Sequence, residues 1–294
     1  MSVSQTDDAG DTAAGFAFAF SAYFLWGFLP LYMKLMEHIP PVEIVTHRIL
    51  WSIPVAAALL IALGRTRDIR DALTSPRVLA MGCVTALLLS LNWGIYIWAI
   101  NSGNALDAAL GYYINPLFSV FLGFALLKER LSKLQWGAVA LAFVAVVILT
   151  LDAGRVPLAA LGMTVTWGLY AFFKKWLPIG PNQGFLLEAI ILAGPALIYL
   201  LIVESNGTGH FGENLWVLMG CGVVTAVPLL LYANGAKRLR LSTIAIMQYI
   251  APTLIFLIAV FVFHEPFGQA RAIAFPMIWA ALVLYSVSML GKRA

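Results

Sequence analysis

The chain has 294 residues, of which 62% are apolar and 11% are charged, and its mean hydropathy is +0.90. No water-soluble core uses that mixture, so the composition excludes a soluble globular protein and predicts an integral membrane protein. We interpret the net charge of +4 as a signal of membrane orientation, and we expect no nucleic-acid partner.

Ten apolar stretches are long enough to cross roughly 30 Å of hydrocarbon as helices. They lie at approximately 14–36, 43–63, 77–99, 106–127, 133–151, 156–176, 184–203, 213–235, 241–263 and 269–290. Most are apolar on all faces, whereas a barrel strand needs only about ten residues with alternating polarity. The sequence therefore predicts an all-α polytopic membrane protein with ten transmembrane helices.

The segment before the first stretch, residues 1–13, contains three Asp residues and no Lys or Arg, which is the reverse of a secretory leader. We expect a disordered cytoplasmic tail there, without a cleaved signal. The two cysteines, Cys83 and Cys221, fall inside apolar stretches. They are therefore predicted to be small core residues, and a disulfide framework or metal site is not indicated.

Basic residues predict the orientation of the chain in the membrane. If the N-terminus is inside, fourteen of the eighteen Lys and Arg residues fall in cytoplasmic loops and ends. The outer side then keeps Lys34, Arg155 and Arg271, and Arg48 lies within a helix. Both termini are therefore predicted to face the cytoplasm.

Two phrases of the sequence occur twice. "YINPLFSVFLGFALLKE" at 113–129 is echoed 136 residues later by "YIAPTLIFLIAVFVFHE", and "WGFLPLYMK" at 26–34 is echoed by "WGLYAFFKK" at 167–175. Five helices make each half, 14–151 and 156–290, and an odd number of helices inverts the second half. Inverted repeats with a binding site between them near the bilayer midplane are an architecture of secondary transporters. A duplication kept only for packing remains the alternative.

Several longer segments together carry a family resemblance. They are "YFLWGFLPLYMK", "EIVTHRILWS", "LNWGIYIWAI", "LGYYINPLFSVFLGFALLKERLSKLQ", "TWGLYAFFKK" and "LSTIAIMQYIAPTLIFL". With them the chain resembles the drug/metabolite transporter superfamily, specifically the EamA family and its RarD-type branch. The resemblance implies a ten-helix permease of the bacterial inner membrane, which moves small organic metabolites or drugs, usually outward. It does not specify a substrate.

The segment "EIVTHRILW" places Glu43 and His47 four residues apart, with Arg48 beside them. A guanidinium inside a membrane helix should face protein or water, so we expect Arg48 to recognise an anion, with its planar fork on a substrate carboxylate. A structural ion pair with Glu43 and a snorkelling side chain remain the alternatives for Arg48.

His47 is a candidate for proton coupling, and the alternative is that it hydrogen-bonds a neighbouring residue. Adding 141, the offset between the repeated phrases at 26 and 167, to His47 reaches Glu188.

Two prolines, Pro116 and Pro252, are predicted to break helices and to free backbone carbonyls for a hydrated cavity. The polar residues beside them form the predicted central site: Tyr112, Tyr113, Asn115, Gln248 and Tyr249. These groups both donate and accept hydrogen bonds, which suits a polar head on an apolar or aromatic body. Simple kinks packed against neighbouring helices are the alternative.

Further candidates for the cavity lining lie well inside the predicted helices. They are Trp26, Trp93, Tyr96, Trp167, Tyr170 and Tyr232, with the amide Asn92. Their rings suit stacking or cation attraction, with core packing as the alternative, and for Asn92 interhelical bonding is the commoner role. Lys34 and Lys175, equivalent across the repeat, are candidate gating residues that pair with acids on neighbouring helices. Interfacial snorkelling is their alternative.

The sequence thus predicts a secondary transporter that works by alternating access, exporting amino acids or other amphipathic zwitterions. The alternatives are an exporter of cationic or neutral drugs and, in another class, a membrane scaffold or lipid-handling protein. No HExxH, GxSxG or nucleotide-binding Gly-rich loop is present, so we expect neither an enzyme nor an ATP-driven pump. We expect no cofactor and no metal, and partners limited to a small-molecule substrate and the bilayer. Monomer and homodimer stay open.

Overall fold

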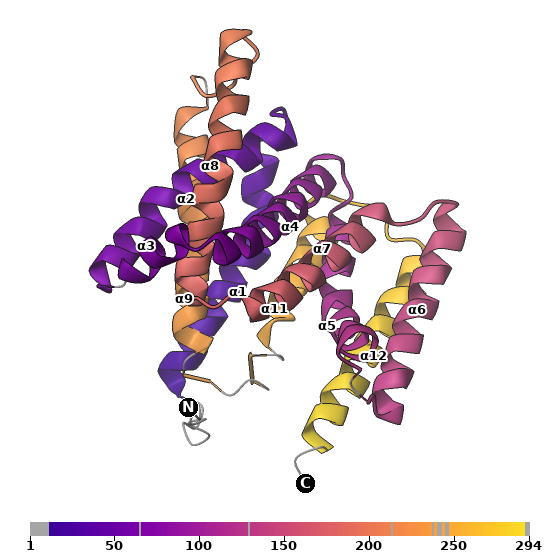
Figure 1. Ribbon diagram of the computed structural model, residues 1–294. Coiled ribbons are helices and arrows are strands. Elements are labelled where there is room, and N and C mark those ends of the chain that lie inside the picture. Colours follow the sequence, from indigo (N-terminus) through magenta and orange to yellow (C-terminus); the bar gives the residue numbers. More distant parts are fainter. Residues whose placement is uncertain are drawn as a thin grey trace, which may run out of the picture.

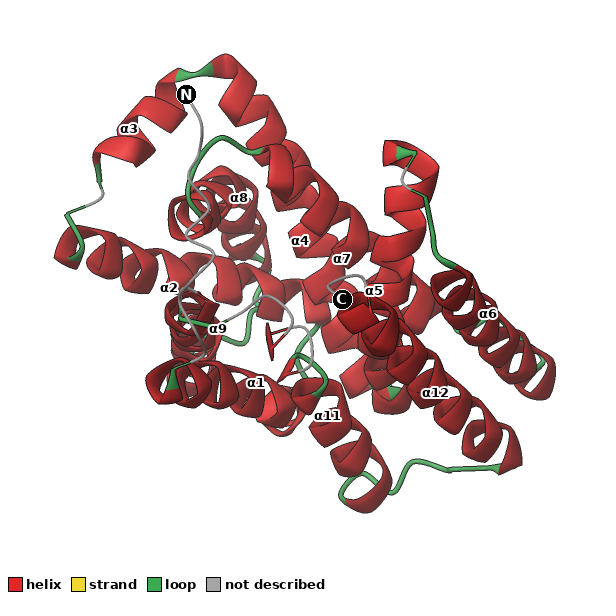
Figure 2. Cartoon of the chain, turned by 90° about the horizontal axis from the view of Figure 1, so that it is seen from below, coloured by secondary structure: helices red, strands yellow, loops and turns green. Residues whose placement is uncertain are grey.

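The computed structural model describes residues 12–291 except 65, 129, 213, 237, 240–242 and 245–246. Throughout this described chain the regular elements are helices, joined by turns and short loops (Figures 1 and 2). The helices are α1 (Ala13–Lys34), α2 (Pro41–Ala62), α3 (Arg67–Thr74), α4 (Pro76–Asn101), α5 (Ala105–Leu127), α6 (Lys133–Ala153), α7 (Leu158–Trp176), α8 (Pro181–Ser205), α9 (Leu215–Ala236), α11 (Ile250–Phe261) and α12 (Gln269–Gly291). The prediction of an all-helical chain is confirmed, and most of the predicted tail, residues 1–11, lies outside the described residues.

Eight of the described helices are long and apolar enough to cross a membrane: α1, α2, α4, α5, α6, α8, α9 and α12. α7 lies where the sixth span was predicted, and α11 is a shorter apolar helix of 12 residues inside the predicted ninth. Four residues at the start of that ninth stretch lie outside the description. The chain is therefore a multi-pass membrane protein.

A short helix, α3, occupies a segment between two of the predicted membrane spans. Its sequence RDIRDALT is strongly charged, so hydropathy alone gives no sign of a helix. Ile69 and Ala72, three residues apart, are buried and form one face of the helix. That spacing was the available signal, and the charge of the segment outweighed it.

Local sequence explains where the long helices begin. Proline stands at the start of α2, α4 and α8, where its missing N–H has no helical partner to lose. Thr12 caps α1 by accepting a hydrogen bond from the Gly15 N–H at 3.0 Å. Ser132 and Gln135 form a reciprocal capping box at the start of α6.

Eight helices pack in a closed order: each contacts the next along α1, α9, α2, α8, α4, α7, α5 and α11, and α11 contacts α1 again. α6 and α12 pack side by side outside this ring, at one edge of the molecule in both views, and reach it through α5 (Figures 1 and 2). We call α1, α2, α4, α5 and α6 the first half and α7, α8, α9, α11 and α12 the second. Exchanging the halves in this order maps every ring contact, and the α6–α12 contact, onto one of the same set.

Hydrogen bonds between loops tie several helix ends together at one end of the molecule. Asn101 at the end of α4 donates to the Met36 carbonyl just after α1, at 3.4 Å. Arg155, between α6 and α7, donates to Asn104, between α4 and α5, at 3.3 Å. Glu43 at the start of α2 also lies here. We call this end the Glu43 end, and the opposite end the Glu188 end.

Candidate functional site

Arg48 is the eighth residue of α2 and only 4% of it is exposed. Its Nε–H donates to Oγ1 of Thr225 on α9 at 3.1 Å, and its Cζ lies 4.3 Å from the ring centroid of Trp93 on α4. Nη1 is buried and has no hydrogen-bond partner among the described residues. The guanidinium is therefore held between three helices by a hydroxyl and an aromatic face, with donor capacity left over.

The neighbours of Arg48 come from both halves of the molecule. Cys221, Tyr112 and Tyr96, on α9, α5 and α4, lie within electrostatic range of the guanidinium. The Tyr96 hydroxyl is buried, and it too has no hydrogen-bond partner in the described part of the chain. The site thus combines a permanent positive charge with neutral hydroxyl and thiol groups.

A single glycine sets the spacing of the two helices that flank Arg48. A Cβ at Gly222 of α9 would overlap the carbonyl oxygen of Trp51 on α2. Trp51 lies three residues after Arg48, and Gly222 lies three residues before Thr225. The absence of a side chain at Gly222 therefore lets α2 and α9 approach closely enough for the bond between Arg48 and Thr225.

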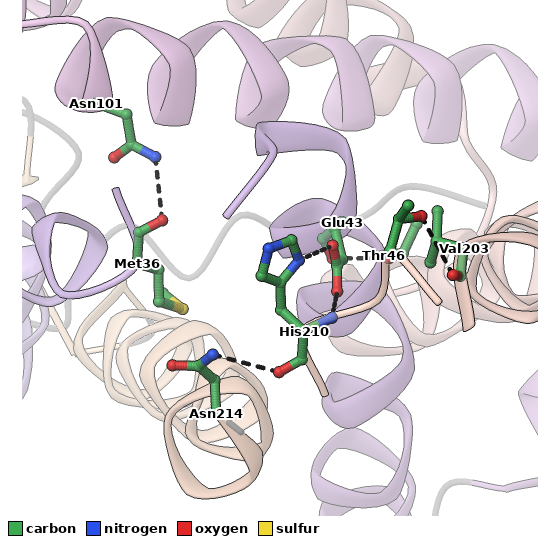
Figure 3. Close-up of polar contacts among 8 residues, drawn as sticks. Met36, Glu43, Thr46, Asn101, Val203, His210 and Asn214 are labelled. Carbon is green, nitrogen blue, oxygen red and sulfur yellow. Dashed lines mark hydrogen bonds and ion pairs between the residues drawn. The ribbon is translucent and has the colours of Figure 1, made fainter. Parts of the chain in front are cut away.

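Glu43 does not form an ion pair with Arg48. Its fully buried carboxylate accepts the backbone N–H of His210 at 2.7 Å and contacts Nδ1 of the same residue at 2.8 Å (Figure 3). His210 lies in the α8–α9 loop, and Asn214 at the end of that loop donates to its carbonyl at 3.3 Å. Snorkelling is also excluded for Arg48 because the whole side chain is buried.

The same loop covers His47. The Phe211 ring stacks on the His47 imidazole at 5.1 Å with an interplanar angle of 16°, and on Trp51 at 6.1 Å. Neither ring nitrogen of His47 has a hydrogen-bond partner among the described residues. The sequence gives no sign that a loop more than 160 positions away covers Glu43 and His47.

The equivalent position of the second half holds the opposite charge. α2 begins at Pro41 and α8 begins at Pro181, so Arg48 and Glu188 are each the eighth residue of their helix. Glu188 is fully buried and pairs with Lys174 Nζ at 2.6 Å, and it accepts the Tyr170 hydroxyl at 3.2 Å. Lys174 also lies 5.3 Å from the Tyr170 ring centroid. Unlike Arg48, this buried charge is matched by an opposite charge.

The predicted central site is brought together only in part. Tyr113 of α5 and Thr253 of α11 share a hydrogen bond of 2.7 Å that joins the two halves. Asn115 is buried and Tyr112 packs against Tyr96 at 6.0 Å. Gln248 and Tyr249 lie just before α11 and are half-buried.

The two prolines differ in their position relative to the helices. Pro116 lies inside α5, whereas Pro252 is the third residue of α11 as described. Residues 248–249, directly before α11, form a turn that follows the helical residue Met247, so a break in the helix lies just before Pro252.

The remaining candidates serve packing contacts in this structure. Trp26 and Tyr232 form an aromatic cluster with Tyr23 at 5.7–5.9 Å between α1 and α9, and Trp167 packs on Tyr170 at 5.3 Å. Asn92 donates to the Met163 carbonyl and to Thr166, which ties α4 to α7.

Lys34 does not pair with a neighbouring helix as predicted. It pairs at 2.5 Å with Glu37, which is within reach three residues further on. The side chain of Lys175 lies outside the described residues, and the paired lysine of the second half is Lys174 instead.

Comparison with known proteins agrees with this geometry. Two segments of the chain, residues 13–151 and 155–287, match the EamA-like transporter family. An "Uncharacterized transporter" of Vibrio cholerae is 43% identical, with 96% of this chain and 95% of that protein covered. "Protein RarD" of Salmonella typhi is 39% identical over 95% of this chain and 96% of its own length. A solved crystal structure superposes with a TM-score of 0.61 at 19% identity, covering 92% of this chain and 96% of that one, which shows a shared fold.

The chain is helical and multi-pass, and both of its halves match a family of transporters, so it is a membrane transporter. The chain belongs to the EamA family of the drug/metabolite transporter superfamily, and RarD proteins are among its relatives.

Proposed function

We propose that this chain is a secondary carrier that moves a small organic solute across the bacterial inner membrane by alternating access, in the outward direction. In this proposal ten helices cross the membrane as two inverted five-helix halves, residues 14–151 and 156–290. Both termini are cytoplasmic and the Glu43 end faces the periplasm. The distribution of Lys and Arg in the loops supports this orientation.

One observation carries the proposal: at the Glu43 end, each half holds the other through a buried carboxylate. Glu43 of the first half accepts two hydrogen bonds from His210 of the second half. In the reverse direction, Glu265 of the second half accepts the backbone N–H groups of Ala105 and Leu106, at 2.5 and 3.0 Å, at the start of α5. Hydrogen bonds to a charged acceptor are the stronger kind, and a helix N-terminus favours a negative charge.

The carboxylate contact at the Glu188 end is of a different kind. Lys174 and Glu188 both belong to the second half, so their ion pair does not join the halves. Carboxylates that join the two halves, which we call latches, therefore lie at the Glu43 end. Among the described residues, no such carboxylate lies at the Glu188 end. This asymmetry fits a carrier in which the Glu43 end is closed, and which exposes its site to the periplasm when the latches release.

The native thiol of Cys221 tests this proposal without knowledge of the substrate. Cys221 is fully buried, lies on α9 one turn before Thr225, and is one of two cysteines. In a Cys83→Ala background, a charged, membrane-impermeant thiosulfonate is applied to right-side-out and to inside-out vesicles. We expect Glu43→Gln to accelerate labelling from the periplasmic side about tenfold and to slow labelling from the cytoplasmic side. Lost hydrogen bonds to a charged group are worth about 1.5–3 kcal/mol.

Glu37→Gln is the matched control. Glu37 is an exposed glutamate at the same end of the molecule, and its ion pair is with Lys34, three residues before it in the chain. Its substitution should leave both labelling rates unchanged. Labelling of Cys221 from one side alone in all variants would contradict alternating access, as would equal effects of Glu43→Gln and Glu37→Gln.

A further inference from the structure

We propose that Arg48 binds the carboxylate of an organic anion or zwitterion, and that cationic solutes are excluded from this site. The proposal rests on the transport function above for its role in the cell, but the binding step can be tested separately. It names the substrate class of the site and the residue that selects it.

The first argument is charge balance. Arg48 is a buried cation, and no described carboxylate lies within ion-pair distance of it. Glu43, the nearest acid on its own helix, is already occupied by His210. A buried charge without a counterion is strongly unfavourable. The Arg48 site therefore favours a bound solute that supplies the missing negative charge.

The second argument is the supply of hydrogen-bond donors. Arg48 Nη1 and the Tyr96 hydroxyl are both buried without a partner among the described residues, and the two side chains lie within electrostatic range. Nε is fixed by Thr225, which holds the plane of the guanidinium in place. The unpartnered N–H of Arg48 and the unpartnered O–H of Tyr96 are both donors that the oxygen atoms of a carboxylate can accept.

The third argument concerns aromatic faces, which would be the attraction for a cationic drug. The face of Trp93 is already covered by Arg48 at 4.3 Å, and the face of Tyr170 by Lys174 at 5.3 Å. Both rings were candidates for binding a cation, and both carry a resident cation instead. A cationic guest would find both of these faces occupied, and at Trp93 it would also meet a positive charge that has no counterion among the described residues.

Three probes that share a phenyl ring separate the charge classes: 3-phenylpropanoate, phenylalanine and 2-phenylethylamine. Binding of each to the purified full-length protein in detergent is measured by the concentration dependence of its thermal midpoint, which requires no transport. We expect 3-phenylpropanoate or phenylalanine to raise the midpoint and 2-phenylethylamine to leave it unchanged. Arg48→Gln should weaken binding of the carboxylate probe at least about thirtyfold, because truncation removes one partner of a buried charge pair.

Arg48→Lys and Thr225→Val keep the proposal testable if the Arg48→Gln variant does not fold. Arg48→Lys keeps the charge but loses the planar fork, and Thr225→Val releases Nε, so both should weaken binding by a smaller factor. Lys34→Gln is the matched control because Lys34 also lies near an aromatic ring, Phe263, but has Glu37 as its counterion. It should bind the carboxylate probes as the unmodified protein does.

Stabilisation by 2-phenylethylamine but by neither carboxylate probe would overturn the proposal, and so would carboxylate binding that is unchanged in Arg48→Gln, or in both milder variants. Failure of the transport proposal is a separate result. A protein that binds 3-phenylpropanoate through Arg48, but labels at Cys221 from one side only, retains the anion site and loses the carrier mechanism.

Discussion

Arg48 and Glu188 occupy the same position in equivalent helices of the two halves, yet their surroundings differ. Glu188 has a lysine ammonium and a tyrosine hydroxyl within hydrogen-bond distance, whereas Arg48 has one threonine hydroxyl and the face of a tryptophan. One buried charge is neutralised inside the protein and the other is not. The difference suggests that the repeated backbone places a buried ionisable group in each half, and that local partners decide between a structural role and a binding role.

The largest effect is expected where the paired charge is broken. Glu188→Leu leaves the Lys174 ammonium, 18% exposed, without a counterion, and should destabilise the protein by about 3–5 kcal/mol. The double variant Lys174→Met with Glu188→Leu removes both charges and should recover most of that loss. Thermal midpoints in detergent measure both changes. Equal midpoints for the single and double variants would show that the pair is not the source of stability at this position.

A second substitution gives Arg48 the counterion that it lacks. Thr225→Asp places a carboxylate where the hydroxyl now accepts the Nε–H at 3.1 Å, so the Arg48 region should behave like the Glu188 region. We expect the affinity for 3-phenylpropanoate to fall about tenfold or more, because the resident carboxylate competes for the guanidinium. Thr225→Asn, which adds similar volume without charge, is the control. An unchanged affinity in Thr225→Asp would mean that the probe binds elsewhere.

The smallest effect concerns Glu265, a carboxylate between α11 and α12 that has backbone donors in place of a paired lysine. Burial raises the pKa of this carboxyl above its ordinary value of 4.5, although the Leu106 and Ala105 N–H groups and the Arg271 guanidinium oppose the change. The folded protein therefore keeps the proton to higher pH than the unfolded chain. The stability from protonated Glu265 is present in full below 4.5 and is lost as the pH rises through the raised pKa.

Thermal midpoints of the unmodified protein and of Glu265→Gln, measured across this pH window, test the direction in which stability changes with pH. The free energy of unfolding of the unmodified protein, relative to Glu265→Gln, should fall as the pH rises from 4.5. The fall is about 1.4 kcal/mol for each pH unit between the pKa of Glu265 in the unfolded chain and its pKa in the folded protein, and it stops above the folded pKa. The negative charge of the neighbouring Asp107 also helps to raise the pKa of Glu265, and Glu265→Gln removes that interaction as well. An advantage that grows with pH would mean that the two N–H bonds outweigh burial.

Much of the fold could be predicted because long apolar stretches and repeated phrases are local signals. The spans from α1 to α9 lie close to their predicted bounds, whereas α3 was missed because its charge masks a two-residue apolar face. The position of Pro252 relative to the start of α11 could not be predicted, because proline fits both a first turn and a kink.

The candidate site was predictable only where the residue type itself is rare in a membrane helix. Arg48 stands out for that reason. Glu188 is reached only through the repeat, by adding the offset of 141 to His47. Thr225 and His210 do not stand out, since hydroxyl and imidazole groups are ordinary in loops and helices, and their partners are 177 and 167 residues away. Lys174 and Lys175 are adjacent in the sequence, and only the folded chain shows that the first of them pairs with Glu188.

The contact between Gly222 and the Trp51 backbone has a consequence for the timing of release. α2 and α9 belong to different halves, so a movement that separates the halves at this crossing also lengthens the distance from Arg48 to Thr225. When the hydrogen bond to Thr225 breaks, the guanidinium of Arg48 is free to rotate and to be hydrated by water that enters from the bulk. In the proposed carrier, opening the entrance and loosening the grip on a bound anion are therefore one event, with no separate signal needed between them.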